Sequence, residues 1–269
     1  MSSPLPITLI TATTPQHYSQ ISALENHVFY DDPFTIVAFG PERDSPANIE
    51  LRAKGLAKQP EKEGERCVVV MAVMGEDRKE DGNENKEIAG AAQWRFVTGR
   101  EAEENRKAGD EMKSDGGETT EKESAQSGGK EKQKRDEYEE EDEQDTGNGW
   151  GIGANVKFCE DVFLVADEHM LRSTKGRDYA KLTTLVVSPT HQRRGIGQQI
   201  LSRGLEEVDR LNLQCVLAAS KEGLGLYKRF GFVEFETMKL RLWEYEGGEG
   251  FGEDDHVVMW RPPARREEV

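Results

Sequence analysis

Two hydrophobic periods alternate along this chain, one typical of strands and one of helices. Residues 7–13 alternate apolar and polar side chains, which predicts a first strand. A helix is predicted over residues 15–28, because Pro15 suits the first helical position and Thr14, or the threonine before it, can cap it. The sequence YDDPF at residues 30–34 is predicted to break this helix, and residues 46–58 show a second amphipathic helical pattern.

Two apolar runs in the first half predict neighbouring strands. The run CVVVMAVM, residues 67–74, is typical of a buried strand, and IAGAAQWRFV, residues 88–97, is predicted to be its partner. The polar link between them contains glycine and is long for a hairpin, but it is compatible with one.

The second half alternates strands with helices. Residues 156–171 are predicted to form a helix, and residues 181–187 a strand that leads into a helix ending near Arg210. The alternation continues with a strand predicted over residues 214–219 and a short helix over 224–230, which Gly231 ends. Two further strands are predicted over 232–243 and 256–261. Strand, helix, strand, helix, strand predicts adjacent parallel strands joined by crossover helices.

An acidic block interrupts the pattern. Residues 101–148 hold 18 acidic and 8 basic residues, so they carry −10 of the net charge of −16. The few apolar residues there cannot offset a backbone entropy cost of roughly 1–2 kcal/mol per residue. We therefore predict a disordered acidic insertion over residues 100–149, with a single long charged helix as the alternative. The insertion is either a solvated segment or a docking site for a basic partner.

Composition narrows the classes of function. The rest of the chain is mildly acidic, which disfavours nucleic-acid binding and suits a cationic small molecule or a basic peptide. The three cysteines form no pair, and the histidines lack metal-ligand spacing, so no metal site is expected. The N-terminus resembles no secretory signal and no apolar run could span a bilayer. We expect an intracellular, cytoplasmic protein without membrane partners, with the nucleus as an alternative location.

The turn at residues 192–197 has the character of an anion site. A helix that begins near Gly195 leaves its first N–H groups unpaired and carries a partial positive charge. Gly195 and Gly197 lack side chains that would cover these groups, and Arg193 and Arg194 add charge. These features predict a binding site for a diphosphate. A tight, closely packed turn is the structural alternative.

The turn does not fit two common phosphate motifs. No Gly-Lys-Ser/Thr follows it, so it is not a P-loop. Ile200 stands where a dinucleotide fingerprint would place its last glycine. A nucleotide-binding α/β protein is therefore only a weaker interpretation, which competition by NAD would test.

A larger pattern resembles the GNAT acetyltransferase superfamily. The stretch LTTLVVSPTHQRRGIGQQIL, residues 182–201, is similar to motif A, whose core of Gln/Arg-x-x-Gly-x-Gly/Ala is matched by Gln192, Gly195 and Gly197. The later LYKRFGF, residues 226–232, is similar to the end of motif B. The run ASKEGLGLYKRFGF, residues 219–232, followed by a late MWRPP, looks most like fungal members. The resemblance implies one α/β domain over 1–269, interrupted by the insertion. Its mixed, mostly antiparallel sheet of about six or seven strands has a splayed parallel pair at its centre and helices at its sides.

The resemblance also implies a binding site for acetyl-CoA as cosubstrate. In the family, N–H groups of motif A bind the pyrophosphate, and the strand before it binds the pantetheine arm in the gap of the sheet. Ser220 stands where many relatives carry an asparagine, which weakens that assignment. The implied cofactor-binding residues are Leu185, Val186, Val187, Gln192, Arg193, Arg194, Gly195, Ile196, Gly197, Gln198 and Ser220.

Tyr227 occupies the family's tyrosine position beside the thioester. It is predicted to be the catalytic residue that protonates the departing thiolate, or else to hold the sulfur by a hydrogen bond. Candidates for the base are Glu160, Asp161 and Asp178, although each of them is better explained as a solvated surface carboxylate. The resemblance implies an acceptor pocket near residues 27–34 and the loop before Trp260, where Tyr30, Asp31, Asp32 and Phe34 could hold a cationic amine. An exposed turn with a buried Phe34 explains these residues equally well.

The sequence therefore predicts an N-acetyltransferase, an acyltransferase that moves an acetyl group from acetyl-CoA to an amine by direct attack. The acceptor is a small molecule or a basic peptide. The alternative is a non-catalytic acyl-CoA-binding module that uses its acidic insertion to bind a basic partner. Acceptor identity, acyl length and oligomeric state are not encoded in any recognisable motif.

Overall fold

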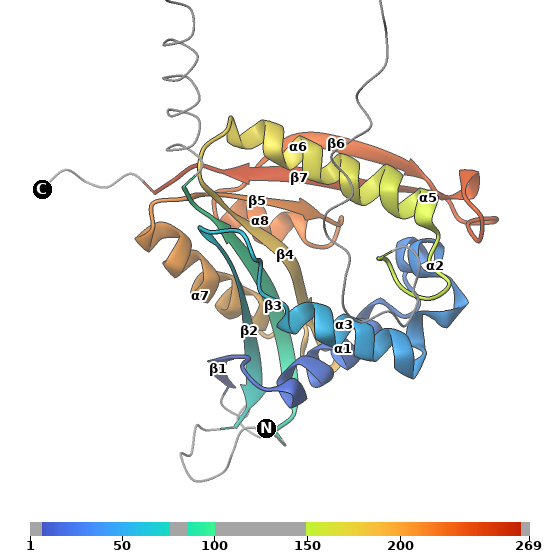
Figure 1. The fold of residues 1–269 in the computed structure, drawn as a ribbon, viewed down its shortest axis with the longest axis horizontal. Helices are drawn as coiled ribbons and strands as arrows, with labels where there is room; N and C mark the ends of the chain where they lie inside the picture. Colours follow the sequence, from blue (N-terminus) through green and yellow to red (C-terminus); the bar gives the residue numbers. More distant parts are fainter. Residues whose placement is uncertain (1–6, 76–85, 100–148, 265–269) are drawn as a thin grey trace, which may run out of the picture.

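A computed structural model describes residues 7–75, 86–99 and 149–264, and in them seven strands form one mixed sheet (Figure 1). The strand order is β1-β2-β3-β4-β5-β7-β6, with helices on both faces, so the predicted fold class is confirmed. Residues 100–148, which hold nearly all of the expected insertion, lie outside the described residues. The strands are β1 (Ile7–Thr11), β2 (Glu65–Met74), β3 (Ile88–Val97), β4 (Tyr179–Val187), β5 (Gln214–Ala219), β6 (Val233–Arg241) and β7 (Glu253–Arg261).

Strand direction divides the sheet at its centre. Strands β1 to β4 form an antiparallel meander in which β2 and β3 are the expected pair. Among the described strands, only β4 and β5 run parallel to one another as neighbours. Beyond β5, the antiparallel β6–β7 pair completes the sheet.

The prediction that β4, β5 and β6 are adjacent parallel strands is wrong for β6. Strand β6 follows the helix after β5 but does not pair with β5, because β7 lies between them and is antiparallel to both. The alternation of strands and helices identified the crossover from β4 to β5 correctly. It could not reveal that a later strand would take the position beside β5.

The N-terminal helices differ from expectation at one point. Helix α1 (Pro15–Phe29) begins after Thr14, whose hydroxyl accepts from the N–H of His17 at 3.2 Å, and α3 (Pro46–Ala57) is capped in the same way by Ser45. Between them lies α2 (Pro33–Phe39), which the sequence analysis missed. Asp32 caps α2 and Pro33 is its first residue, so a proline taken as a helix breaker is in fact a helix start.

The remaining helices cover the two faces of the sheet. The expected helix over 156–171 is present as α5 (Val156–Cys159), a π-helical turn (Glu160–Leu164) and α6 (Val165–Thr174), which packs over β5, β6 and β7 (Figure 1). Helix α7 (Ile196–Arg210) and the short α8 (Leu224–Arg229) pack on the opposite face. No helix of the described part of the chain has the length and apolar content to cross a bilayer.

Helix α7 packs closely against β3 at Gly204. A Cβ atom placed on Gly204 would lie 2.1 Å from the ring of Trp94, which is fully buried. Glycine therefore allows α7 to lie directly on this ring. The contact sets the height of α7 above the sheet, and with it the position of the N-terminal end of the helix.

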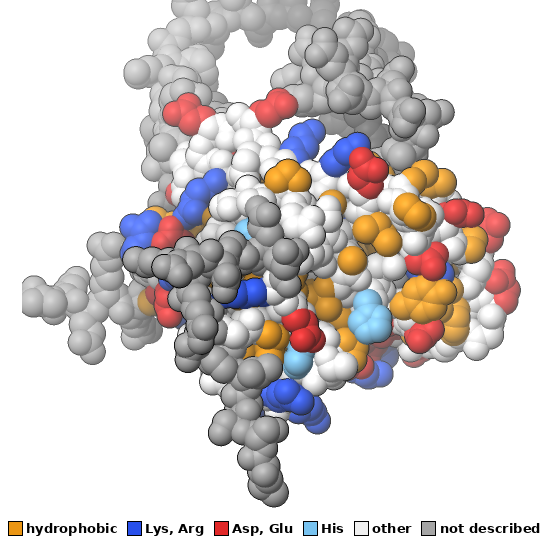
Figure 2. Space-filling view, turned by 90° about the horizontal axis from the view of Figure 1, so that it is seen from below, with side chains coloured by type: hydrophobic (Ala, Val, Ile, Leu, Met, Phe, Trp, Pro, Cys, Tyr) orange, Lys and Arg blue, Asp and Glu red, His pale blue; other side chains and the backbone are white. Residues whose placement is uncertain are grey.

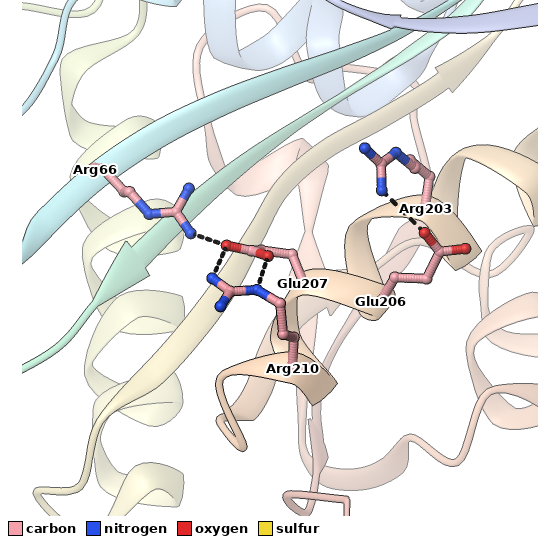
Figure 3. Close-up of polar contacts among 5 residues, drawn as sticks. All are labelled: Arg66, Arg203, Glu206, Glu207 and Arg210. Atoms are coloured by element: carbon pink, nitrogen blue, oxygen red, sulfur yellow. Dashed lines mark hydrogen bonds and ion pairs between the residues drawn. The ribbon is translucent and has the colours of Figure 1, made fainter.

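An ion-pair cluster ties the other end of α7 to β2 (Figure 3). Glu207 accepts from Arg210 at 2.7 and 2.9 Å and from Arg66 of β2 at 2.5 Å. These hydrogen bonds, chiefly the one from Arg210, lower the pKa of Glu207 to about 2. The neighbouring pair between Arg203 and Glu206 stays within the helix and joins no other element.

Glu207→Gln should lower the free energy of unfolding by about 1 kcal/mol at neutral pH, because the charge-assisted bonds to two arginines are lost. The folded-state pKa is depressed, so this stabilisation is complete above the ordinary value of 4.5 and is lost as the pH falls towards 2. Urea unfolding at several pH values measures it. Glu206→Gln is the matched control and should cost less than half as much. Equal losses for both variants would contradict the cross-element role of Glu207.

Candidate functional site

The central parallel pair opens along its length. Strand β4 pairs with β5 from Tyr179 to Lys181 and then leaves it, although both strands continue. At this point Thr183 is an extra residue on β4, because Gln93 of β3 pairs with Thr184 and the next residue, Trp94, pairs with Leu182. A bulge of this kind bends its strand. Figure 1 shows β4 running steeply away from β5, as the expected splayed pair requires.

The opening between β4 and β5 beyond Lys181 is called the gap below. The alternation of backbone groups along β4 determines which of them face this gap. The N–H of Ser188 donates to the C=O of Ala89, and Val186 pairs with Ala91 two residues back along β4. In an antiparallel ladder, alternate residues bond the partner strand and those between them point away. Leu185 and Val187 therefore direct their N–H and C=O groups towards the gap. Val186, predicted to act with them, directs its own towards β3.

The turn and first residues of α7, residues 192–198, follow this strand directly and are called the mouth of α7 below. Gly195 is in the left-handed region with φ of 81°, and no side chain caps the helix. Arg193 is also left-handed, with φ of 63°, a conformation that costs a non-glycine residue about 1 kcal/mol or more. The N–H groups of Ile196, Gly197 and Gln198 have no acceptor among the described residues. The turn thus presents unpaired donors at a positive helix end.

The mouth is not covered by the described part of the protein. A Cβ atom on Gly195 would have no neighbour within 4 Å, and residues 192–195 are exposed. Neither Arg193 nor Arg194 forms an ion pair with a described residue, so their charge is available to an anion. Gly197 is half-buried, and a Cβ atom there would lie at ordinary contact distance from apolar side chains, 3.5 Å from Val187 and 3.6 Å from Leu226.

Gln192 has a structural contact of its own. Its amide Nε2 donates to the C=O of Val187 at 3.2 Å and so joins the turn to the end of β4. This bond takes one of the acceptors that would otherwise face the gap. The predicted residue therefore lies at the site, with its side chain bonded to the protein backbone.

Tyr227 of α8 lies on the same face of the sheet as the mouth. Its ring is buried in the cluster that also packs Ile196, Leu185 and Val187. Burial, and to a smaller degree Cys215, raises the pKa of its hydroxyl to about 12. Tyr227 consequently keeps its proton over the whole physiological range, as a proton donor must. Ser220 follows β5 and is exposed, and its C=O accepts from Gly223 at 3.1 Å.

The residues expected to hold an acceptor are only partly assembled. Tyr30 is exposed, with the guanidinium of Arg43 4.7 Å from the centre of its ring, and Asp31 is exposed beside it. Asp32 caps α2 through Thr35, and Phe34 is buried on the face of the sheet opposite Tyr227. On the right of Figure 2, towards α2 and the β6–β7 end, acidic side chains surround exposed apolar ones.

None of the three candidate bases lies at the gap. Asp161 binds Lys157 and accepts from the hydroxyl of Tyr245 at 3.1 Å, and these contacts, led by the one with Lys157, lower its pKa. Glu160 lies beside it on the π-helical turn. Asp178 accepts from Gly99 at 2.9 Å and precedes β4, at the end of the strand opposite the gap.

His256 of β7 lies beside the end of β5, and no sequence motif pointed to it. Its ring lies 4.5 Å from that of Phe34 and its Nδ1 is buried without a hydrogen-bond partner. Nothing in the local pattern marks it, because its surroundings come from strand pairing. In the described ranges, no three His, Cys, Asp or Glu side chains are grouped to hold a metal ion.

Comparison with known proteins finds one family model that matches the segment forming the gap and the mouth. Residues 159–234 match the model described as acetyltransferase (GNAT) domain. This match runs from the end of α5 to the start of β6, so it includes β4, the mouth of α7, β5 and Tyr227. No curated protein matches the chain.

Solved structures agree in fold over almost the whole chain. One, titled histone acetyltransferase HPA2 and related acetyltransferase, from Corynebacterium glutamicum, is 16% identical with a TM-score of 0.50 and covers 97% of this chain and 98% of its own. A mosquito arylalkylamine N-acetyltransferase like 5b is 16% identical, with a TM-score of 0.51 and coverage of 96% and 100%. An agmatine N-acetyltransferase mutant is 13% identical, with a TM-score of 0.52 and the same coverage.

At these identities the similarity concerns the fold, whereas the family model matches the sequence of the site itself. Residues 159–234 are thus similar in sequence to an acetyltransferase (GNAT) domain, and the chain shares its α/β fold with those solved acetyltransferase structures.

Proposed function

We propose that this protein is an N-acetyltransferase that moves the acetyl group of acetyl-CoA to an amine by direct attack. The observation that carries the proposal is the opening of β4 from β5 directly beside the uncovered mouth of α7. A phosphate-rich molecule with a long amide-bearing arm fits such a pair of features. Its diphosphate would occupy the mouth and its arm the gap.

The mouth supplies what a diphosphate needs. The unpaired N–H groups of Ile196, Gly197 and Gln198 can donate to phosphate oxygens, and the helix dipole favours their charge. Arg193 and Arg194 stand exposed at the rim without carboxylate partners among the described residues. Because Gly195 has no side chain, the phosphates could approach the backbone closely.

The gap supplies what the pantetheine arm needs. An extended chain with amide groups can pair with an open strand as a further strand would. Leu185 offers both an N–H and a C=O to such a chain, and Val187 offers an N–H. The thioester would then lie near the end of β5, where α8 holds Tyr227.

The chemistry requires the amine nitrogen to attack the acetyl carbonyl carbon while the carbon–sulfur bond breaks. The thiolate that leaves needs a proton, and Tyr227, with its pKa of about 12, carries one at every pH at which the protein works. The acceptor is a small molecule or a peptide amine. The acidic side chains around α2 favour a cationic acceptor over an anionic one.

Release of free thiol from acetyl-CoA tests the proposed function. The purified protein is incubated with acetyl-CoA and agmatine, spermidine, lysine, kanamycin or a lysine-rich peptide, each in turn. We expect amine-dependent thiol release that saturates with acetyl-CoA. Failure to bind acetyl-CoA would contradict the proposal, and saturable binding without thiol release from any amine would favour a non-catalytic binding module instead.

Gly195→Asn should weaken CoA binding by at least about tenfold, because the new side chain would project into the space assigned to the diphosphate. Asparagine tolerates a positive φ better than other side chains, which limits the backbone strain. Gly99→Asn is the matched control, since Gly99 has φ of 87° and equally free surroundings away from the site. Calorimetric titration with CoA measures both. Equal affinities for the two variants would contradict the placement of the diphosphate.

Tyr227→Phe should lower kcat at least tenfold and leave KM for acetyl-CoA within about twofold, because the ring and its packing remain and only the proton donor is lost. Steady-state thiol release at neutral pH measures both constants. A raised KM with unchanged kcat would instead assign the hydroxyl to ground-state binding of the cosubstrate.

A further inference from the structure

The pairing register of β5 and β7 places His256 just beyond the end of β5. Ala219, the last residue of β5, pairs with Val257 of β7, so His256 lies one residue beyond the end of β5 and opposite Ser220. On its other side His256 pairs with Met238 of β6. The histidine therefore stands at the end of β5, where the proposed thioester would emerge from the gap.

Side-chain alternation places His256 and Tyr227 on opposite faces of the sheet. Val257 and Met259 pack in the same cluster as Tyr227, whereas Val258 packs with Phe34. Residues two apart on a strand share a face, so His256 lies on the side of Val258. Its ring contacts Phe34 at 4.5 Å between centroids, in agreement with this assignment.

The imidazole is held by packing and lacks a hydrogen bond at Nδ1. This atom is buried, and no described group donates to it or accepts from it. The ring itself is only partly buried. A half-turn about the Cβ–Cγ bond exchanges the covered and exposed edges of the ring, and no bond at Nδ1 opposes that turn. A buried nitrogen without a partner costs free energy, which a role in catalysis would explain.

Two carboxylates, Asp254 and Asp32, lie close enough to His256 to act on it electrostatically. Asp254 precedes His256 on the same face of β7, and Asp32 caps α2. Glu222, in the loop between β5 and α8, lies near enough to influence Asp254. Desolvation first, and then Asp32 and Glu222, raise the pKa of Asp254. None of the three forms an ion pair with another described residue.

We propose that His256 is the base that takes the proton of the acceptor amine, from the face of the sheet opposite Tyr227. This inference rests on the proposed function. The nitrogen–carbon bond of the amide forms, the carbon–sulfur bond of the thioester breaks, and the proton of the amine passes to the imidazole. The proton from Tyr227 converts the thiolate to the thiol. The imidazolium and the tyrosinate then return to their starting states by exchange with solvent.

The electrostatics of the site suit this step. Burial lowers the pKa of His256 below its ordinary value of 6.5, so the free ring is neutral and able to accept a proton at physiological pH. Asp254 and Asp32 act in the opposite direction and oppose the effect of burial only in part. Met238 of β6 and Phe34 contribute no charge. Once protonated, the ring would be stabilised by both carboxylates, which favours the transfer.

A pH profile of the intact protein tests the inference. Thiol release is measured from about pH 5 to pH 8, with whichever of agmatine, spermidine and the lysine-rich peptide is acetylated fastest. For the unaltered protein, kcat should fall on the acid side with a midpoint below 6.5, as the ring becomes protonated. His256→Gln should lower kcat on the order of 100-fold and remove this acid limb, with KM for acetyl-CoA within about twofold.

His169→Gln is the matched control, because His169 lies on α6 and bonds Arg172 away from the gap. It should leave kcat and the acid limb unchanged. Calorimetric CoA binding and the melting temperature establish that the His256→Gln protein is folded. If this variant binds CoA and keeps the acid limb, the inference is overturned while the proposed function stands. If the unaltered protein acetylates no amine, both are overturned.

Discussion

The site depends on the separation of β4 from β5. Parallel strands that begin paired at Tyr179 and are still extended beyond Lys181 would normally continue their ladder, because unpaired backbone groups in a sheet cost free energy. Here the extra residue at Thr183 bends β4 towards β3 and away from β5. The backbone groups of Leu185 and Val187 are then left without a neighbouring strand on that side, and the proposed function assigns this open edge to the pantetheine arm.

The layers on either side of the sheet give the gap two different environments. On one face, Gly204 lets α7 lie on Trp94, and the ion pairs of Glu207 hold the far end of the helix to β2. These contacts fix the mouth at Gly195 beside the end of β4. On the other face, α2 and β7 bring carboxylates and His256 together around Phe34. The proposed reaction accordingly places its proton donor, Tyr227, on one face and its proton acceptor, His256, on the other.

Much of this arrangement could be predicted from sequence because its signals are local. The apolar run before Ser188, the glycines after it and the helical stripe of α7 identify the mouth and the strand beside it. A local signal also explains one error, because Pro33 follows the end of α1 and was taken as a helix breaker although it starts α2.

Non-local pairing could not be predicted in the same way. Strand β7 lies between β5 and β6, and this insertion places His256 at the end of β5 next to Phe34, which is more than two hundred residues earlier in the chain. Neither residue carries a motif. Only the register across three strands identifies the histidine, so the missed residue is one whose surroundings are created by the tertiary fold.

Amide hydrogen exchange in β4, followed by NMR with and without CoA, tests the central claim most directly. If the pantetheine arm pairs with the open edge of β4, the amides of Leu185 and Val187 should exchange at least about tenfold more slowly in the complex. The amide of Val186, already directed towards β3, should change much less. Saturation with CoA that leaves Leu185 and Val187 unprotected would contradict the account.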